Sequence, residues 1–159
     1  MNWNTSIKVA RQDFLTQPSD HQLKISKTFQ QLNELDCLVV ILNKTGEIVF
    51  INTYACKLLN VSFDEVIGKS WIERFIPDDQ RDELSKSFTV MAKGITAPFD
   101  SYYNDVITYN NERISLHWKN TFIYDDRDNV IASFSIGSET SCFDHLPDID
   151  LHSLMSSEC

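Results

Sequence analysis

The sequence predicts an α+β protein, with a five-stranded antiparallel sheet, short helices on one face of it and an N-terminal helical cap. Two β-branched runs joined by a glycine turn begin at Cys37, and three consecutive strand-like runs fill the last third of the chain. Between these groups, apolar residues recur at helical spacing. Strands followed by helices and then by strands are typical of an α+β domain.

Residues 1–34 are expected to form the helical cap. Ser19 and Gln22 have the spacing of a capping box, which favours a helix start. Ile25, Phe29 and Leu32 then recur at helical spacing and form one apolar face. This face lies outside the predicted sheet domain, so either the sheet or a second copy of the chain must cover it. We predict that it forms the interface of a homodimer.

The first two strands are predicted to form a hairpin. Residues 37–43 (CLVVILN) and 48–52 (IVFIN) are rich in β-branched residues, and Gly46 lies in the turn between them. A short helix is expected next, with Asn52 as its N-terminal cap.

Two further helices are predicted before the last strands. Ser62 and Glu65 form a second capping box, and Gly68 stands where a helix end favours a left-handed residue. A longer helix is expected to follow Pro77 and to stop at Gly94, since acidic residues favour its N-terminus.

The last three strands are predicted over residues 99–109, 113–124 and 130–137. In the middle strand, apolar and polar residues alternate, which indicates one buried face. Asn120 falls on the apolar side of this alternation, where an unpaired amide costs about 1–3 kcal/mol. A ligand, a backbone group or a water molecule could satisfy it.

Composition excludes several classes of function. The net charge of −9 opposes binding to a phosphate backbone, so no nucleic-acid partner is expected. The longest strongly apolar run is far shorter than the ~20 residues that span a bilayer, so we expect no membrane segment and a cytoplasmic protein. Phosphate-binding loops, nucleophile elbows and kinase signatures are missing, so the chain is not expected to be an enzyme. No metal site is expected, and residues 141–159 are interpreted as an acidic tail.

Three segments in this order resemble the PAS domain family: NKTGEIVFIN, LLNVSFDEVIGKSW and ISLHWKNTFIYDDRDNVIASFSIGSET. The resemblance covers about residues 35–140. It implies a sensory or dimerisation module with a pocket between the sheet and the small helices. Different members of the family hold haem, flavin or a small organic ligand there, or nothing, and the fold alone does not choose among these.

The sequence departs from the family at three places. Light-sensing flavin-binding members have an Asn-Cys pair after the glycine turn, where this chain has Trp71. Haem-binding members take a histidine from the long helix or the next strand, and residues 78–110 contain none. The segment Ser138–Thr140 only approximates the signature that often leads to an output helix. The cofactor is therefore unknown, with haem and adduct-forming flavin disfavoured.

The candidate pocket residues are Trp71, Phe75, Trp118, Asn120 and Cys56. Trp71 and Phe75 are helical neighbours, and Trp71 is interpreted as a core residue first and a ligand contact second. Trp118 is expected in the core. Cys56 is either a ligand-contacting thiol or a small buried hydrophobe.

These observations predict a cytoplasmic sensory module. It would bind a small ligand or a signalling partner and relay binding through rearrangement of a dimer and of its flanking helices. The alternative is a ligand-free, constitutive dimerisation module with a filled core. Occupancy of the pocket distinguishes the two.

Overall fold

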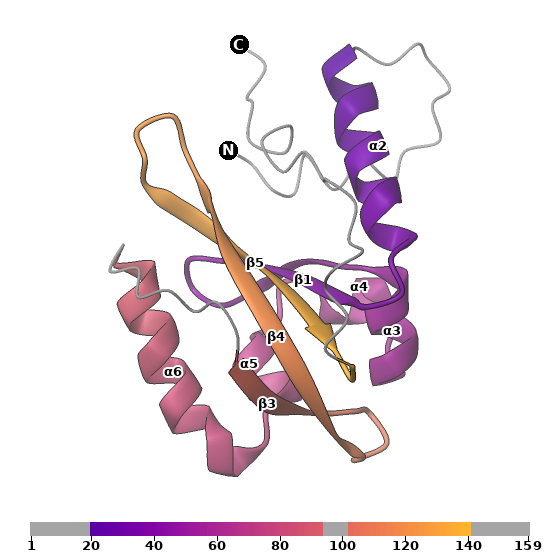
Figure 1. Cartoon of the computed structure of the whole chain (residues 1–159), viewed down its shortest axis with the longest axis vertical. Helices are drawn as coiled ribbons and strands as arrows, with labels where there is room; N and C mark the ends of the chain where they lie inside the picture. The colour runs from indigo at the N-terminus through magenta and orange to yellow at the C-terminus, as the bar shows by residue number, and fades with distance from the viewer. Residues whose placement is uncertain (1–19, 94–101, 141–159) are drawn as a thin grey trace.

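The computed structural model describes residues 20–93 and 102–140 (Figure 1). The helices are α2 (Asp20–Asn33), α3 (Thr53–Leu59), α4 (Phe63–Val66), α5 (Trp71–Phe75) and α6 (Asp78–Ala92). The strands are β1 (Leu38–Asn43), β2 (Ile48–Ile51), β3 (Tyr102–Ile107), β4 (Arg113–Tyr124) and β5 (Val130–Ser138). Predictions for Ser19, for Gly94 and for the acidic tail concern residues outside the described ranges. Within those ranges, no helix is both long and apolar enough to cross a membrane.

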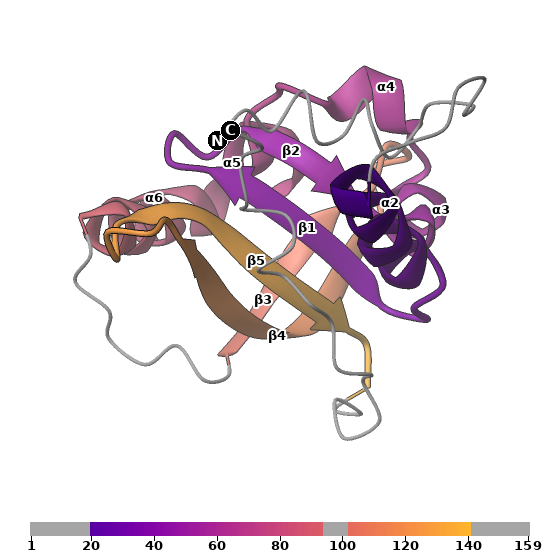
Figure 2. The ribbon, with the colours of Figure 1, turned by 90° about the horizontal axis from the view of Figure 1, so that it is seen from above.

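The strands form one five-stranded antiparallel sheet in the order β2-β1-β5-β4-β3, which confirms the predicted fold class. The sheet is twisted, and β4 and β5 cross the middle of the molecule with α6 along one side (Figures 1 and 2). The first and last strands of the sequence, β1 and β5, meet at its centre. They therefore bring the hairpin and the C-terminal strands into one layer.

Both faces of the central strands are covered, whereas the sequence predicted one buried face. The inner face carries Leu38 and Val40 of β1, which pack with the apolar side chains of α3, α4, α5 and α6. The outer face carries Val39 and Ile41, which pack with α2. Because successive residues of a strand point to opposite sides, β1 reads as a continuous apolar run.

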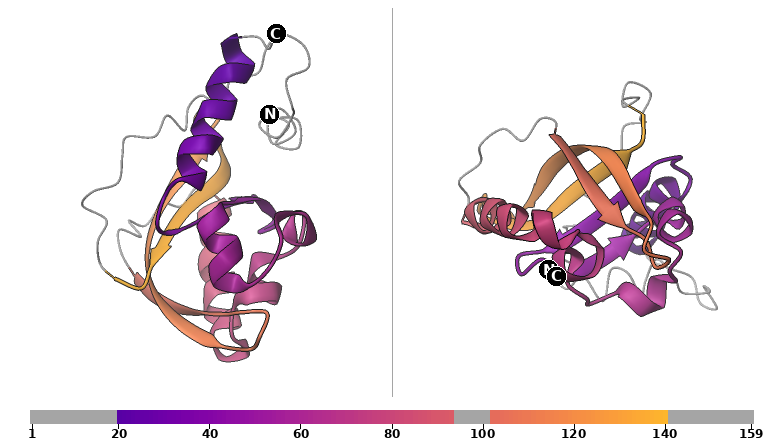
Figure 3. Two further views of the ribbon diagram at one scale, coloured as in Figure 1. Left: turned by 90° about the vertical axis from the view of Figure 1, so that its right-hand side faces the viewer. Right: turned by 90° about the horizontal axis from the view of Figure 1, so that it is seen from below.

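The apolar face of α2 is covered by the sheet of its own chain. Ile25, Phe29 and Leu32 are 3%, 3% and 0% exposed, and the ring centroid of Phe29 is 4.7 Å from that of Phe50 in β2. The prediction that these three side chains form the interface of a homodimer is therefore wrong, because the sheet of the same chain already covers them. The physical reason is the short connection from α2 to β1, which holds the end of the helix against the sheet. The helix extends away from the domain at the end opposite the β3–β4 turn (Figure 3).

Asn52 joins α2, β1 and α3 through its side chain. Its Oδ1 accepts hydrogen bonds from the backbone N–H groups of Val39 and Ala55, both at 3.0 Å. Its Nδ2 donates to the carbonyls of Leu32 (2.9 Å) and Cys37 (2.8 Å). The predicted helix cap is confirmed, and the same amide also fixes the C-terminal end of α2.

Candidate ligand-binding site

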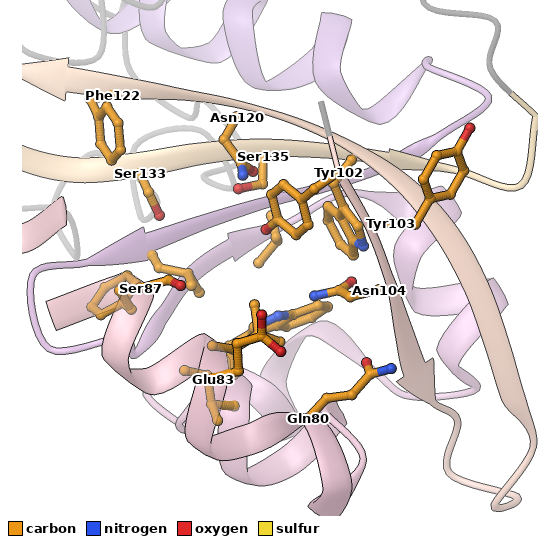
Figure 4. Close-up of a pocket in the computed structure, with 17 residues that line it drawn as sticks. Gln80, Glu83, Ser87, Tyr102, Tyr103, Asn104, Asn120, Phe122, Ser133 and Ser135 are labelled. Atoms are coloured by element: carbon orange, nitrogen blue, oxygen red, sulfur yellow. The ribbon is translucent and has the colours of Figure 1, made fainter. Parts of the chain in front are cut away.

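A cavity of about 290 Å³ lies between the inner face of the sheet and helices α5 and α6 (Figure 4). The strands contribute side chains from β1, β3, β4 and β5, and the helices contribute Trp71, Ile72 and one side of α6. This is the region where the sequence predicted a pocket.

Local sequence fixes Trp71 at the edge of the cavity. Gly68 adopts a φ of 81°, which ends the preceding turn, and the Ser70 side chain caps α5 by accepting from the Glu73 backbone N–H. The Trp71 backbone N–H donates to the carbonyl of Gly46, at 3.0 Å, in the β1–β2 turn. The first residue of α5 is thereby held against the first hairpin.

Aromatic rings form one wall of the cavity. The Trp71 ring lies 4.9 Å from the ring of Phe75 and meets Trp118 edge-on, at 6.0 Å between centroids. Trp71 is 6% exposed, so the prediction that it packs inward is confirmed. The ring serves the core and also borders the cavity.

The first turn of α6 is held to the sheet by charged and amide side chains. The Arg113 guanidinium binds both carboxylate oxygens of Asp79 at 2.9 Å and contacts Asp105 at 2.6 Å. Gln80 and Asp105 exchange two hydrogen bonds, at 3.3 and 3.0 Å. The Arg113 guanidinium holds the pKa of Asp79 and of Asp105 below the usual range for a carboxyl group. These contacts fix the helix that forms the second wall.

Polar groups also border the cavity. Asn104 Oδ1, Trp118 Nε1 and Asn120 Oδ1 are buried and have no hydrogen-bond partner in the described part of the chain. Burial raises the pKa of the Tyr102 phenol, and a hydrogen bond from Asn120 opposes that rise. An apolar cavity with a few convergent polar groups is typical of a small-molecule site.

Three of the five predicted pocket residues line the cavity, and two do not. Trp71, Trp118 and Asn120 line the cavity. Phe75 lies behind Trp71 and supports its ring, and Cys56 lies on α3, away from the cavity lining.

Sequence reasoning missed the residues that β3 and α6 contribute. Tyr102 and Asn104 alternate with exposed Tyr103, whose ring points away from the cavity in Figure 4. This alternation is visible in the sequence and could have placed both residues on the inner face. Glu83 and Ser87 carry no such signal, because their positions follow from how α6 docks on the sheet.

The lining does not fit an adduct-forming flavin or a histidine-ligated haem. Among the described residues that border the cavity there is no cysteine and no histidine. His117 points from the other side of β4 and stacks on Tyr103 at 4.4 Å between ring centroids. The described ranges also contain no group of His, Cys, Asp and Glu side chains that could hold a metal ion.

The order of strands and helices and the cavity between them agree with one family. A sequence profile described as PAS fold matches residues 27–137, well over half of the chain. The chain belongs to the PAS family. The predicted resemblance is therefore confirmed, and the match begins inside the segment that was predicted as a separate cap.

Solved PAS domains share the fold at low identity. The PAS domain of the Cronobacter turicensis RpfR quorum-sensing receptor, in complex with BDSF, is 19% identical, with coverage of 66% of this chain and 94% of that one and a TM-score of 0.54. A Colwellia psychrerythraea PAS domain is 12% identical, with coverage of 73% and 96% and a TM-score of 0.59. A Rhodobacter sphaeroides LOV protein is 8% identical, with coverage of 77% and 70% and a TM-score of 0.58. No curated protein sequence matches the chain.

Proposed function

We propose that this PAS domain is a sensory module that binds a small molecule in the cavity between its sheet and helices α5 and α6. The observation that carries the proposal is a cavity with aromatic walls and three buried polar atoms that no described residue satisfies. Leaving such atoms unpaired costs about 1–3 kcal/mol each, and a ligand can recover that cost. The RpfR PAS domain, which has the same fold, is in complex with BDSF in one structure and with C12:0 in another.

The relay in this proposal begins at α6. Its hydrogen bonds and ion pairs to the sheet come from the first turn, while Leu84 and Phe88 border the cavity through apolar contacts. A ligand that enters the cavity pushes on these two side chains, so α6 pivots about its fixed first turn. Helix displacement around a ligand is a common switching element in proteins.

The relay then reaches α2 through the inner core. Trp71 packs in the same apolar cluster as Ala55 and Leu59 of α3, and Asn52 caps α3 while it binds the carbonyl of Leu32 in α2. A shift of α3 therefore moves Asn52 and changes how the C-terminal end of α2 is held. The proposal keeps residues 35–140 as the sensing unit, residues 1–34 as the output and residues 141–159 as an acidic tail.

The proposal also includes a cytoplasmic homodimer without enzymatic activity. Cys37 and Cys56 are free thiols among the described residues. Because the apolar face of α2 is covered, a dimer would form through other surfaces, and light scattering of the full chain measures whether it exists.

The rival function is a ligand-free interaction module. The cavity volume of about 290 Å³ lies at the lower end of the range of ligand pockets, about 300–1,000 Å³, so a small empty space in the core is the alternative to a binding site. In that case, the cavity is a packing imperfection and its polar atoms are satisfied by water.

Native mass spectrometry of the protein purified from its own host tests the proposal. We expect a mass excess that disappears on denaturation and a small molecule in the denatured extract. The Ser135→Leu variant, which fills the cavity, should lose this mass excess, while the control Thr121→Leu on the exposed side of β4 should keep it. A wild-type protein without bound mass, and without a ligand that stabilises it in a metabolite screen, would favour the interaction module.

A further inference from the structure

The residues that line the cavity carry charge of one sign. Of the 17 residues that line it, Glu83 is the only one with an ionised side chain, and none is Lys, Arg or His. The connection from α6 to β3 begins with Lys93, which is exposed and does not line the cavity. A carboxylate in this cavity would find no cationic side chain among the residues that line it.

The two arginines that contact the start of α6, Arg113 and Arg81, already have partners. Arg113 binds Asp79 and Asp105 outside the cavity. Arg81 pairs with Asp78 at 2.7 Å and donates to the carbonyl of Ile76 at 2.9 Å. Neither arginine lines the cavity, so recruiting one for a ligand would break contacts that hold α6 in place.

Glu83 directs its charge into the site. Figure 4 shows its carboxylate reaching from α6 toward the space that Tyr102 and Asn104 border. The residue is exposed, so its carboxylate lies at the open side of the cavity and remains partly hydrated. At that place it attracts a cationic group on a ligand and repels an anionic one, with a strength that solvent reduces.

Two of the three buried polar atoms at the cavity that have no described partner favour a ligand that donates hydrogen bonds. Asn104 Oδ1 and Asn120 Oδ1 are acceptors, while Trp118 Nε1 is a donor that a hydroxyl oxygen of the same ligand can satisfy. An ionised carboxylate has only acceptor atoms, whereas an ammonium or a hydroxyl group donates. The rings of Trp71 and Trp118 add flat apolar contact, and an aromatic face also attracts a cation.

From these observations we infer that the cavity selects compact ring compounds with a neutral hydrogen-bond donor or an amine, and rejects carboxylates of the same skeleton. The inference rests on the proposed function, because it names the chemical class of the ligand that the sensor holds. Glu83 is the specificity-determining residue, and it acts on charge rather than on shape.

Two series of matched compounds test this inference by titration calorimetry. The first consists of tryptamine, indole-3-ethanol and indole-3-acetate, and the second of octylamine, octanol and octanoate. In the wild-type protein, we expect the amine to bind about 1.4- to fivefold more tightly than the alcohol, which corresponds to the ~0.2–1 kcal/mol of an exposed ion pair. The carboxylate should bind about tenfold or more weakly than the alcohol, because its charge is desolvated without a partner.

Variants at Glu83 and at the neighbouring Asp82 distinguish an effect of the Glu83 carboxylate on the ligand from an effect of the net charge of the protein. Glu83→Gln should remove the preference for the amine over the alcohol, and Glu83→Lys should bring the carboxylate to at least the affinity of the alcohol. Asp82→Asn removes the same charge from an exposed position of α6 that does not line the cavity, and it should leave the order unchanged. Thermal melts of all three variants confirm that they are folded.

Each contrary outcome has its own meaning. A carboxylate that binds as tightly as the alcohol in the wild-type protein overturns this inference and leaves the proposed function standing. A preference for the amine that survives Glu83→Gln, or that Asp82→Asn also removes, overturns the role of Glu83. If none of the six compounds binds, both the inference and the role of the cavity as a small-molecule site are overturned.

Discussion

The indole of Trp118 lies directly over Gly137, its cross-strand partner in β5. A Cβ atom added at Gly137 would stand only 3.0 Å from Cζ3 of the ring and 3.1 Å from two further ring atoms. The missing side chain therefore sets how closely Trp118 approaches the sheet. Because Trp118 also meets Trp71, this approach shapes the aromatic wall of the cavity.

Gly137→Ala should lower the free energy of unfolding by about 1–3 kcal/mol, the usual cost of an overpacked core. The added methyl group pushes the indole away from the sheet. Urea denaturation measures the loss. In a Trp118→Phe background, the smaller ring gives the methyl group room, so the same substitution should cost less. Equal costs in the two backgrounds would show that the ring and the glycine are not coupled.

Trp71→Ala should cost about 3–5 kcal/mol of stability, the range for removing a buried aromatic side chain. The variant loses the contacts of the ring with Phe75 and Trp118. Tyr109→Ala is the matched control, since this ring is 64% exposed and its removal should change stability by at most about 0.5 kcal/mol. A Trp71→Ala protein that melts like the wild type would place the ring at the surface.

Asn52→Ala should be among the most damaging substitutions of a polar residue. It leaves two backbone N–H groups and two carbonyls without their partner, and a buried group in that state costs about 1–3 kcal/mol. We expect a loss of at least about 3 kcal/mol and faster hydrogen exchange in α2. Ser70→Ala removes one exposed cap bond of 3.3 Å and should cost about 0.5–2 kcal/mol. Similar losses in the two variants would argue against the role of Asn52 in joining α2 to α3.

Arg113→Met should make stability less dependent on acid pH. The folded-state pKa values of Asp79 and Asp105 are lowered by Arg113, so the pair contributes stability above the unfolded pKa of Asp, about 3.9. That contribution is lost as the pH falls through the lowered folded pKa values. The difference between wild type and variant should thus be largest near pH 7 and should shrink below about pH 4. Urea denaturation across this range measures it, and a difference that grows toward low pH contradicts the assignment.

Local patterns in the sequence were enough to predict most of the elements. The alternation in β4 gave its inward residues, Gly68 has the left-handed backbone expected of it, and Asn52 caps α3. The Glu65 side chain accepts from the Ser62 backbone N–H at 2.8 Å, as the capping box requires. Each of these signals depends on neighbours within four residues, so no tertiary contact is needed to recognise them.

Contacts between distant residues could not be predicted in the same way. Arg113 pairs with Asp79 across 34 positions, a contact that no local pattern in the sequence indicates. The cover of α2 on the outer face depends on how the helix turns into β1, which no periodicity reveals. Cys56 is a further example. The sequence placed it among the candidate pocket residues, but the packing of α3 keeps it out of the cavity lining.

A larger side chain on the inner face of the sheet tests whether the empty cavity lowers the free energy of unfolding. Ser135 lies on the inner face of β5 between Val40 and Asn120, and Figure 4 shows its side chain directed toward the cavity. In Ser135→Val, two methyl groups replace a buried hydroxyl, and a β-branched residue suits a central strand. If the cavity serves a ligand, this change should raise the free energy of unfolding by about 0.5–2 kcal/mol, as filling a functional cavity often does.

The same variant should bind indole-3-ethanol more weakly than the wild type does, because the added methyl groups occupy ligand space. Thr121→Val, on the exposed side of β4, introduces the same side chain outside the cavity and should change stability by at most about 0.5 kcal/mol and leave binding unaltered. Thermal or urea unfolding and calorimetry measure the two effects on one preparation. A Ser135→Val protein that is less stable than the wild type would mean that the inner face has no space for the methyl groups. Unchanged binding in a stabilised variant would instead place the ligand away from β5, since a side chain that fills its site must compete with it.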